Sequence, residues 1–427
     1  MKNFLLKNFT ILIIFLFTSS TFYISFADDY IENNITIDVD SEISEAISKT
    51  DNTLLPSSIN SRSCVVFDRN SHMILYGKNE NSQVKMASTT KIMTAIIVIE
   101  NSNLKDTVEV SKKAASTSGS RLGLKAGDKI TVHDLLYGLM LVSGNDAAVC
   151  LAEHVGGNIE GFANLMNKKA SELSLSNTHY ESPHGLDSDG HYTTAYELAV
   201  LSDYALKNET FSKIVATKSY TVTINGYPKN LSNTNELLGN LNGIYGIKTG
   251  FTNGANRCLV TACKRNDMDI ICVVLGADTK KFRTQDSIKL IEFAFKNYTY
   301  INANDIANKA FENWKKDNIE KIYIDKSSSL PELSLNLLEN PIISINKNSA
   351  NNIDSYISIY PDLEAPINSD TILGTLTLTS ENEEIVTLNI ITSSYIKKKD
   401  IFYYLNFFFT NYSSILENSL SWQYKKD

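Results

Sequence analysis

The chain has 427 residues, of which 43% are hydrophobic, so it can bury a sizeable core and is long enough for more than one domain. That composition excludes a disordered or fibrous protein. The formal net charge of −8 argues against a nucleic-acid binder, because such proteins carry basic patches.

The first 27 residues have the features of an export signal. Lys2 and Lys7 precede an apolar run, and the segment ends in Ser25-Phe26-Ala27, a small-x-small pattern typical of a signal peptidase site. A plain transmembrane anchor is the alternative, although the apolar run is short and polar residues follow it. We predict a signal peptide over residues 1–27. Its removal takes two lysines and no acids, so the net charge falls from −8 to −10.

Residues 28–60 contain eight acids and one lysine, which predicts a solvated acidic linker. Two alternating runs then flank a polar turn over residues 63–79, and this pattern predicts a β-hairpin. The stretch "KMASTTKIMTAIIVIE", residues 85–100, follows directly and reads as a helix with a polar start. We therefore expect a hairpin that is followed directly by a helix.

The middle of the chain predicts more helices and then strands. Residues 131–155 have helical periodicity interrupted at Ser143-Gly144-Asn145, so we expect two helices joined by a turn. Further helices are predicted near residues 161–173 and from about residue 194, after a turn-rich loop. Three strands and a closing helix follow, at residues 244–252, 256–265, 269–277 and 284–298. Together these elements predict an α+β domain over residues 61–300.

The last part of the chain has a different composition. Alternating runs separated by proline and asparagine predict a small all-β domain over residues 312–396. Residues 397–427 begin with three lysines, and apolar residues then recur on one helical face: Leu405, Phe408, Phe409, Tyr412, Leu416 and Leu420. An interfacial membrane helix, a tilted transmembrane span and docking onto another domain all remain open, and the first fits best.

Cysteine and histidine do not signal a metal or redox site. The five cysteines have no CxxC spacing and sit in apolar surroundings, which favours buried core residues over oxidised pairs: Cys64, Cys150, Cys258, Cys263 and Cys272. The histidines show no HExxH spacing, and a structural role is favoured for His184 and His191. We expect neither a metal nor another cofactor.

A Ser-x-x-Lys pattern occurs five times, starting at Ser82, Ser88, Ser102, Ser344 and Ser394. Only Ser88 opens a long apolar segment, so Lys91 would follow it on the same face of a helix. A serine hydroxyl needs a base, and a lysine can be that base only if its pKa falls well below about 10.4. Burial and the positive end of the helix dipole would both lower it. The alternative is an N-cap serine beside a lysine that reaches solvent.

Two further triplets support the catalytic interpretation. Ser143-Gly144-Asn145 lies in a turn between helices, and Lys248-Thr249-Gly250 lies in a predicted strand. There the lysine and threonine would offer a cation and a donor to a substrate carboxylate, and the glycine would let substrate backbone approach the strand. Each triplet alone has a plain structural explanation.

Ser-x-x-Lys, Ser-x-Asn and Lys-Thr-Gly, in this order, are the signature of penicillin-binding proteins and serine β-lactamases. With "SPHGLDSDGHYTTAYELA" and "GIKTGFTNGANRCLVTACKR", the chain most resembles the low-molecular-mass D-alanyl-D-alanine carboxypeptidases over nearly everything after residue 60. The resemblance implies a β-lactamase/transpeptidase-like domain, with helices on both faces of an antiparallel sheet, then the all-β domain and the amphipathic helix.

The resemblance also implies a role for each matching residue. Ser88 is the acylated nucleophile, and Lys91 its general base. Ser143 relays a proton to the leaving amine, and Asn145 orients Lys91 and bonds the substrate amide. Lys248, Thr249 and Gly250 form the carboxylate-binding strand, and the backbone N–H groups of Ser88 and Phe251 form the oxyanion hole. Many relatives carry histidine at the position of Phe251, and some carry arginine in the segment that here reads Asn233-Thr234-Asn235.

The expected function is serine-type removal of the terminal D-alanine from peptidoglycan stem peptides that end in D-Ala-D-Ala, with β-lactams as inhibitors. That activity would place the protein in cell-wall biogenesis and cell shape. It is expected to be exported and held peripherally at the outer face of the cytoplasmic membrane by its C-terminal helix. The alternatives are a DD-endopeptidase or β-lactamase of the same fold, and a non-catalytic cell-wall scaffold.

Overall fold

A computed structural model describes residues 41, 56 and 58–423, with side-chain surroundings as far as Tyr412. The chain forms two compact units that divide between Lys296 and Asn297. The predicted signal peptide lies outside the described residues, as does almost all of the predicted acidic linker. In sequence the division falls four residues before the predicted end of the first domain, at residue 300.

The first unit is built on a five-stranded sheet in the order β2-β1-β9-β8-β7, with every neighbouring pair antiparallel. Its strands are β1 (Ser63–Asp68), β2 (Ile74–Lys78), β7 (Ile244–Thr252), β8 (Asn256–Arg265) and β9 (Met268–Ala277). All ten residues of the central strand β9 are buried. Side chains on both faces of this strand are therefore covered, which explains its continuous apolar run "IICVVL".

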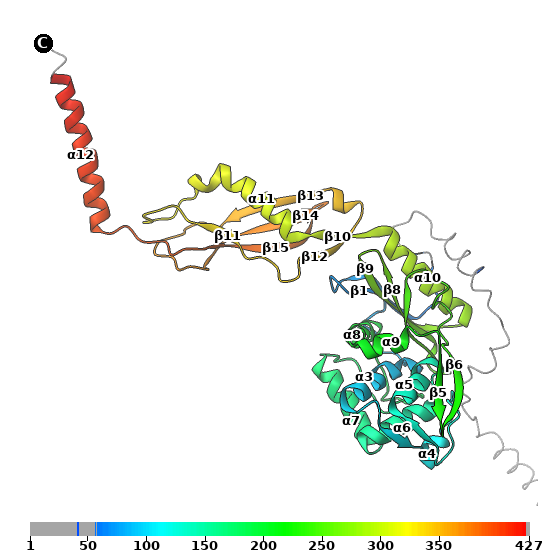
Figure 1. Ribbon diagram of the computed structural model, residues 1–427. Helices are drawn as coiled ribbons and strands as arrows, with labels where there is room; N and C mark the ends of the chain where they lie inside the picture. The colour runs from blue at the N-terminus through cyan, green and yellow to red at the C-terminus, as the bar shows by residue number, and fades with distance from the viewer. Residues whose placement is uncertain (1–40, 42–55, 57, 424–427) are drawn as a thin grey trace, which may run out of the picture. The chain divides into compact units, whose positions relative to one another are not determined.

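Helices cover both faces of this sheet (Figure 1). On one face lies α10 (Lys280–Asn297), whose Phe293 ring meets Tyr76 of β2. The other face carries η2 (Ala87–Thr90), α3 (Lys91–Asn101), α8 (Ala195–Leu206) and α9 (Glu209–Val215). Around them lie α4 (Lys112–Ala115), α5 (Val132–Leu141), α6 (Asn145–Gly156) and α7 (Ile159–Glu172).

The starts of these helices follow from the sequence. The side chains of Thr131, Asn158 and Thr194 each accept a backbone N–H from the first turn of α5, α7 and α8. By contrast α3 has no such cap, and its first eight residues are buried. Helix α3 is thus stabilised by packing in the core rather than by a side-chain cap at its N-terminus.

Two short antiparallel strand pairs were not predicted from the sequence. One pairs β3 (Thr107–Glu109) with β4 (Lys129–Thr131), on either side of α4, and the other is a hairpin of β5 (Ser219–Ile224) and β6 (Tyr227–Ser232). Asn225 and Gly226 both have positive φ, at 52° and 83°, in the turn of this hairpin. An Asn-Gly pair between alternating residues is a strong hairpin signal, so this turn was readable in the sequence.

The second unit is mainly β-structure and carries two helices. Its four-stranded antiparallel sheet has the order β11-β15-β14-β13, formed by Leu333–Leu335, Glu383–Thr392, Ile372–Ser380 and Ile353–Ile359. Strand β10 (Tyr298–Asn302) pairs with β12 (Ile342–Asn346). Helix α11 (Ala303–Asn318), which was not predicted, places Phe311 in the core beside Leu376 and Leu378. Two 3-10 turns, η3 (Ile319–Lys321) and η4 (Ser349–Asn351), complete the unit before α12 (Ile401–Gln423).

Two further findings concern the burial of the cysteines and the length of the helices. All five cysteines are buried with free thiols, as expected for core residues. Over the part of the chain that is described, no helix combines the length and apolar character needed to cross a bilayer.

Candidate active site

Ser88 lies in η2, directly before α3, and is half-buried at the edge of the core. Lys91 is the first residue of α3 and is fully buried. Their side chains face each other across one helical turn, with 2.8 Å between Lys91 Nζ and Ser88 Oγ. Ala87, immediately before the serine, has a φ of 48°, a costly left-handed conformation for alanine.

The other neighbours of Lys91 Nζ determine what the amine can do. It lies 2.7 Å from Asn145 Oδ1 and 2.9 Å from the carbonyl oxygen of His184. Both of these oxygens can only accept hydrogen bonds. A neutral amine has two N–H bonds and one lone pair, so donation to both carbonyl oxygens leaves the lone pair for the Ser88 hydroxyl. Burial also favours the neutral form of a lysine.

Asn145 begins α6, and its amide orientation is fixed from the other side. Its Nδ2 donates to the carbonyl of Ser118 at 2.7 Å, so Oδ1 must face Lys91. Its backbone N–H donates to the carbonyl of Ser120, also at 2.7 Å. The asparagine therefore links the lysine to the loop that contains both serines.

Ser143 lies in the turn between α5 and α6 and has a φ of 59°. Its hydroxyl is buried and has no hydrogen-bond partner within residues 58–423. It therefore makes no hydrogen bond to either Lys91 or Lys248. A buried hydroxyl without a partner is costly, and a bound substrate would supply the missing bond.

Lys248, Thr249 and Gly250 lie on β7, which runs beside η2. Lys248 is buried, and its Nζ donates to the carbonyl of Thr249 at 2.8 Å. A Cβ at Gly250 would lie 3.1 Å from Ser88 N and 3.2 Å from Thr89 N. The missing side chain thus makes room for the turn that carries Ser88, a reason that differs from the predicted approach of substrate backbone.

A cavity of about 570 Å³ opens beside Thr249. Thr249 Oγ1 lies 2.7 Å from Thr234 Oγ1, in the segment where some relatives carry arginine. Among the described residues that line the cavity, Glu236 is the only acid, and five are basic: Arg121, Lys229, Arg257, Lys280 and Arg283. The cavity therefore favours an anionic ligand.

Sequence reasoning missed Arg257 and Arg283, two of the three described arginines that line this cavity. The guanidinium of Arg257 lies 3.7 Å from the centre of the Phe251 ring. Arg283 forms a buried ion pair with Glu236, to which Thr284 also donates at 2.6 Å. Burial alone would raise the pKa of Glu236, but Arg283 and Thr284 hold it below its usual range. No local pattern marks either arginine, because strand β8 and helix α10 bring them to the cavity.

The loop over residues 182–191 forms hydrogen bonds both with α3 and with the end of β7. Pro183 O accepts from Thr94 Oγ1 at 2.7 Å, and His184 O contacts Lys91 as above. Asp187 accepts from Thr252 Oγ1 at 2.6 Å and from the N–H of Gly254 at 2.9 Å. The loop thus fastens the helix that carries Lys91 to the strand that carries Thr249.

The protonation state of His191 follows from its contacts. The N–H of Glu181 donates to Nδ1 at 3.0 Å, so Nδ1 accepts and Nε2 carries the proton toward Thr90 Oγ1, 2.8 Å away. Burial lowers the pKa of His191 to about 4, with a further contribution from His179. Burial lowers the pKa of His184 to about 3. Both histidines are neutral parts of the scaffold at pH 7.

These histidines predict acid sensitivity of the fold. Their folded pKa values lie below the unfolded value of about 6.5, so their stabilising effect is complete above pH 6.5 and is lost as the pH falls toward 4. Each histidine should lower the free energy of unfolding by up to about 1.4 kcal/mol per pH unit in that window. Urea unfolding at pH 7.5, 6 and 5 measures this. His191→Gln should show a shallower decline than the wild type, and equal declines would contradict the prediction.

The chain is similar to several known proteins. A family model described as D-alanyl-D-alanine carboxypeptidase matches residues 49–279. The D-alanyl-D-alanine carboxypeptidase DacF of Bacillus subtilis (strain 168) is 34% identical over 332 residues, which cover 75% of this chain and 82% of that protein.

Solved structures are similar as well. D-alanyl-D-alanine carboxypeptidase DacD from Francisella tularensis matches with a TM-score of 0.70 and 27% identity, over 81% of this chain and 96% of that one. Penicillin binding protein 5 from Haemophilus influenzae matches with a TM-score of 0.64 and 26% identity, over 81% and 99%. These likenesses confirm the predicted fold class, a transpeptidase-like domain followed by a β-rich region and a C-terminal helix.

Proposed function

Since the chain belongs to the D-alanyl-D-alanine carboxypeptidase family, and is a serine-type carboxypeptidase that binds penicillin, we propose that Ser88 is its nucleophile. The observation that carries the proposal is the contact of Lys91 with Ser88, Asn145 and the His184 carbonyl. It supplies a hydroxyl, a buried base and two acceptors that orient the base.

Acylation begins when the Ser88 hydroxyl passes its proton to the Lys91 lone pair. Ser88 Oγ attacks the carbonyl carbon between the two terminal D-alanines and forms a tetrahedral adduct with a negative oxygen. The backbone N–H groups of Ser88 and Phe251 stabilise that oxygen. The close approach of β7 to η2 supports this arrangement, since a Cβ added at Gly250 would lie only 3.1 Å from Ser88 N.

The adduct then collapses as the C–N bond to the last D-alanine breaks. The leaving amine takes the proton that Lys91 received from Ser88, with the buried hydroxyl of Ser143 as the proposed relay, and Lys91 becomes neutral again. The acyl group remains on Ser88 as an ester. Water attacks this ester, Lys91 accepts a proton from the water, and Ser88 Oγ leaves with a proton, which restores the enzyme.

The terminal carboxylate of the stem peptide is proposed to bind at Thr249, which lines the basic cavity. Thr249 offers a hydroxyl, and Arg257 and Arg283, which line the same cavity, supply positive charge. A carboxylate there places the scissile carbonyl toward Ser88 because β7 carries both Thr249 and Gly250. This site accounts for a peptidase that acts at a free C-terminus.

The test is to incubate the chain with an acetylated D-Ala-D-Ala peptide and with a labelled penicillin. Release of free D-alanine, and a penicillin adduct on the peptide that contains Ser88, are expected. The absence of both products would overturn the proposal. Rapid release of hydrolysed penicillin would instead indicate a β-lactamase, and cleavage restricted to cross-linked peptides would indicate an endopeptidase. A non-catalytic scaffold would form no adduct.

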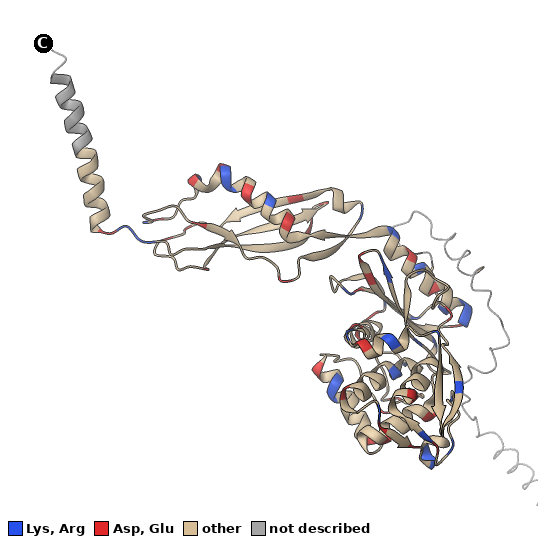
Figure 2. Ribbon diagram, viewed as in Figure 1, with Lys and Arg blue, Asp and Glu red and all other residues tan. Residues whose placement is uncertain are grey.

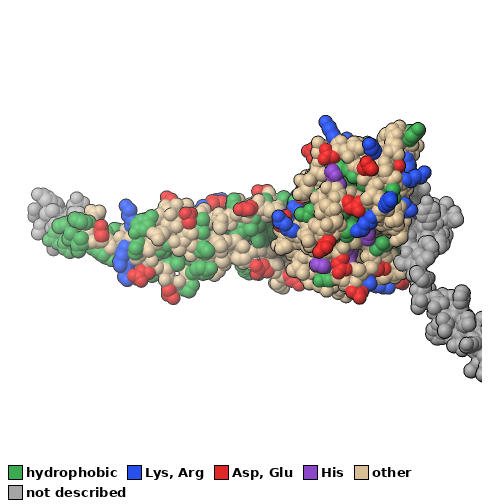
Figure 3. Space-filling model, turned by 90° about the horizontal axis from the view of Figure 1, so that it is seen from below, with side chains coloured by type: hydrophobic (Ala, Val, Ile, Leu, Met, Phe, Trp, Pro, Cys, Tyr) green, Lys and Arg blue, Asp and Glu red, His purple; other side chains and the backbone are tan. Residues whose placement is uncertain are grey.

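The protein is further proposed to be exported and held at the outer face of the cytoplasmic membrane. In α12, residues 401–412 carry no charge and are all exposed, including Phe402, Phe407, Phe408 and Phe409 (Figures 2 and 3). Large apolar patches of this kind mark interaction sites. Lys397, Lys398 and Lys399 precede the helix, and each would add about 1 kcal/mol of attraction to an anionic surface.

This membrane proposal predicts that the chain co-sediments with vesicles containing phosphatidylglycerol. A chain that ends at Asp400 should stay in the supernatant, since it keeps the lysines but lacks the aromatic helix. Tyr356→Ser, which removes an exposed aromatic side chain from β13, is the matched control and should sediment like the wild type. Equal sedimentation of the truncated chain would contradict the proposal.

A further inference from the structure

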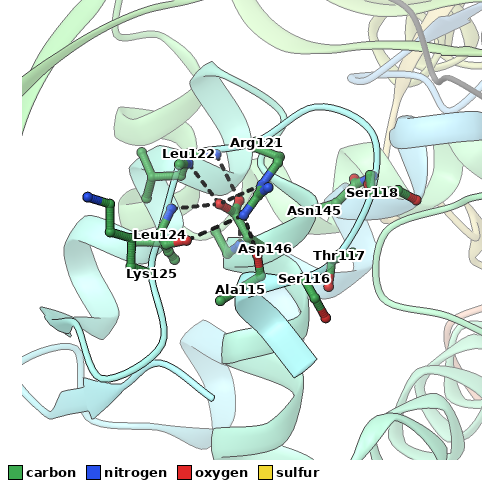
Figure 4. Close-up of polar contacts among 12 residues, drawn as sticks. Ala115, Ser116, Thr117, Ser118, Arg121, Leu122, Leu124, Lys125, Asn145 and Asp146 are labelled. Atoms are coloured by element: carbon green, nitrogen blue, oxygen red, sulfur yellow. Dashed lines mark hydrogen bonds and ion pairs between the residues drawn. The ribbon is translucent and has the colours of Figure 1, made fainter. Parts of the chain in front are cut away.

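Asp146 follows Asn145 in the first turn of α6, and its side chain is fully buried. An aspartate at this position usually interacts with N–H groups of its own helix. Here the carboxylate also receives three N–H groups from a separate segment, residues 116–125, which we call the cavity loop. Leu122 N donates to Oδ1 at 2.8 Å, and Gly123 N and Leu124 N donate to Oδ2 at 2.7 and 2.9 Å (Figure 4).

The first half of the same loop holds the neighbouring residue. Asn145 Nδ2 donates to Ser118 O and its backbone N–H donates to Ser120 O, each at 2.7 Å. Figure 4 shows Asn145 and Ser118 beside the Asp146 cluster. Asn145 and Asp146, consecutive residues of α6, thus form hydrogen bonds with opposite halves of the cavity loop.

The loop touches both parts of the reaction site. Through Asn145 it fixes the amide whose Oδ1 lies 2.7 Å from Lys91 Nζ. Through Ser120, Arg121 and Leu122 it forms one wall of the basic cavity. A shift of the loop would therefore move the partner of the base and the wall of the cavity together.

We propose that Asp146 is a positioning residue for acylation: its buried carboxylate fixes the cavity loop, and the loop fixes the Asn145 amide against Lys91. This inference rests on the proposed acylation of Ser88. Asparagine has the same shape as aspartate, but it offers one acceptor oxygen and no charge. An Asp146→Asn chain would therefore lose at least one of the two oxygens that hold Leu122, Gly123 and Leu124.

The experiment compares Asp146→Asn with a matched variant, Asp134→Asn. Asp134 is also buried, and its Oδ2 accepts one backbone N–H, from Thr223 of β5, at 2.8 Å. For each chain we would measure the second-order rate constant of acylation by labelled penicillin, kcat and KM for the D-Ala-D-Ala peptide, and Tm.

Asp146→Asn is expected to acylate about 10- to 100-fold more slowly than the wild type at a temperature well below its Tm, as expected for misplaced catalytic groups. Its KM should rise, and the acidic limb of its rate–pH profile should move, because the partner of Lys91 has moved. Asp134→Asn should lower Tm but leave both rates within about twofold. Acylation of Asp146→Asn at the wild-type rate, or an equal loss of acylation rate in Asp134→Asn, would overturn the proposal.

A second measurement applies if Asp146→Asn does not fold. In the wild type, the amides of residues 122–124 should exchange hydrogen as slowly as those in the body of α6, because each is bonded to a buried carboxylate. Hydrogen exchange as fast as in exposed loops would overturn the proposal that Asp146 fixes the cavity loop. Failure of the wild type itself to acylate would instead refute the proposed function.

Discussion

Replacing Ser88 with alanine is expected to abolish both the labelled penicillin adduct and the release of D-alanine. The variant lacks the oxygen that is proposed to form the acyl ester, and loss of a nucleophile of this kind lowers kcat by about 10⁴-fold or more. Folding should survive, because Lys91 Nζ keeps Asn145 Oδ1 and the His184 carbonyl as partners. Gel fluorescence of the adduct, a D-alanine assay and the Tm together test this.

The matched control is Ser102→Ala, at the other end of α3. Ser102 also begins a Ser-x-x-Lys pattern, but its hydroxyl donates to the carbonyl of Val98 at 2.7 Å. This variant should form the adduct and release D-alanine like the wild type. An adduct that persists in Ser88→Ala would show that another residue is acylated, and so contradict the site.

The three triplets could be found from sequence because each depends on a local signal. Ser88 opens an apolar helix, Gly144 and Asn145 interrupt a helical period, and Lys248 lies in a predicted strand. Periodicity could not show that the triplets meet, and only the resemblance to a family brought them together. The structure places Lys91 between Ser88 and Asn145 and leaves Ser143 without a direct bond to either lysine.

The cavity could not be predicted because its walls come from segments without a shared pattern. Loop residues such as Ser120, strand residues such as Arg257 and helix residues such as Arg283 meet only through the tertiary fold. Asp146 was missed for a related reason. Its position in a first turn predicts a helix-end role, whereas its three loop contacts depend on a chain segment more than 20 residues away.

Replacing Lys91 with methionine is expected to slow acylation by about 10²- to 10⁴-fold, the usual contribution of a general base. Methionine fills much of the same volume but cannot take the Ser88 proton. The carbonyl oxygens of Asn145 and His184 would lose their donor, and each buried acceptor left without one costs about 1–3 kcal/mol. A slower rate alone would therefore not separate a base from a structural cation.

Lys91→Arg makes that separation. Arginine carries a positive charge and has N–H donors for both carbonyl oxygens, but it cannot lose its proton at any pH at which the protein is folded. A structural cation at this position would tolerate the change, so acylation near the wild-type rate would refute a base role for Lys91. If Lys91 is the base, the arginine variant should be as slow as the methionine variant. Acylation rates measured from pH 5 to 10 give a second criterion: the wild-type rate should rise as Lys91 loses its proton, and both variants should stay flat.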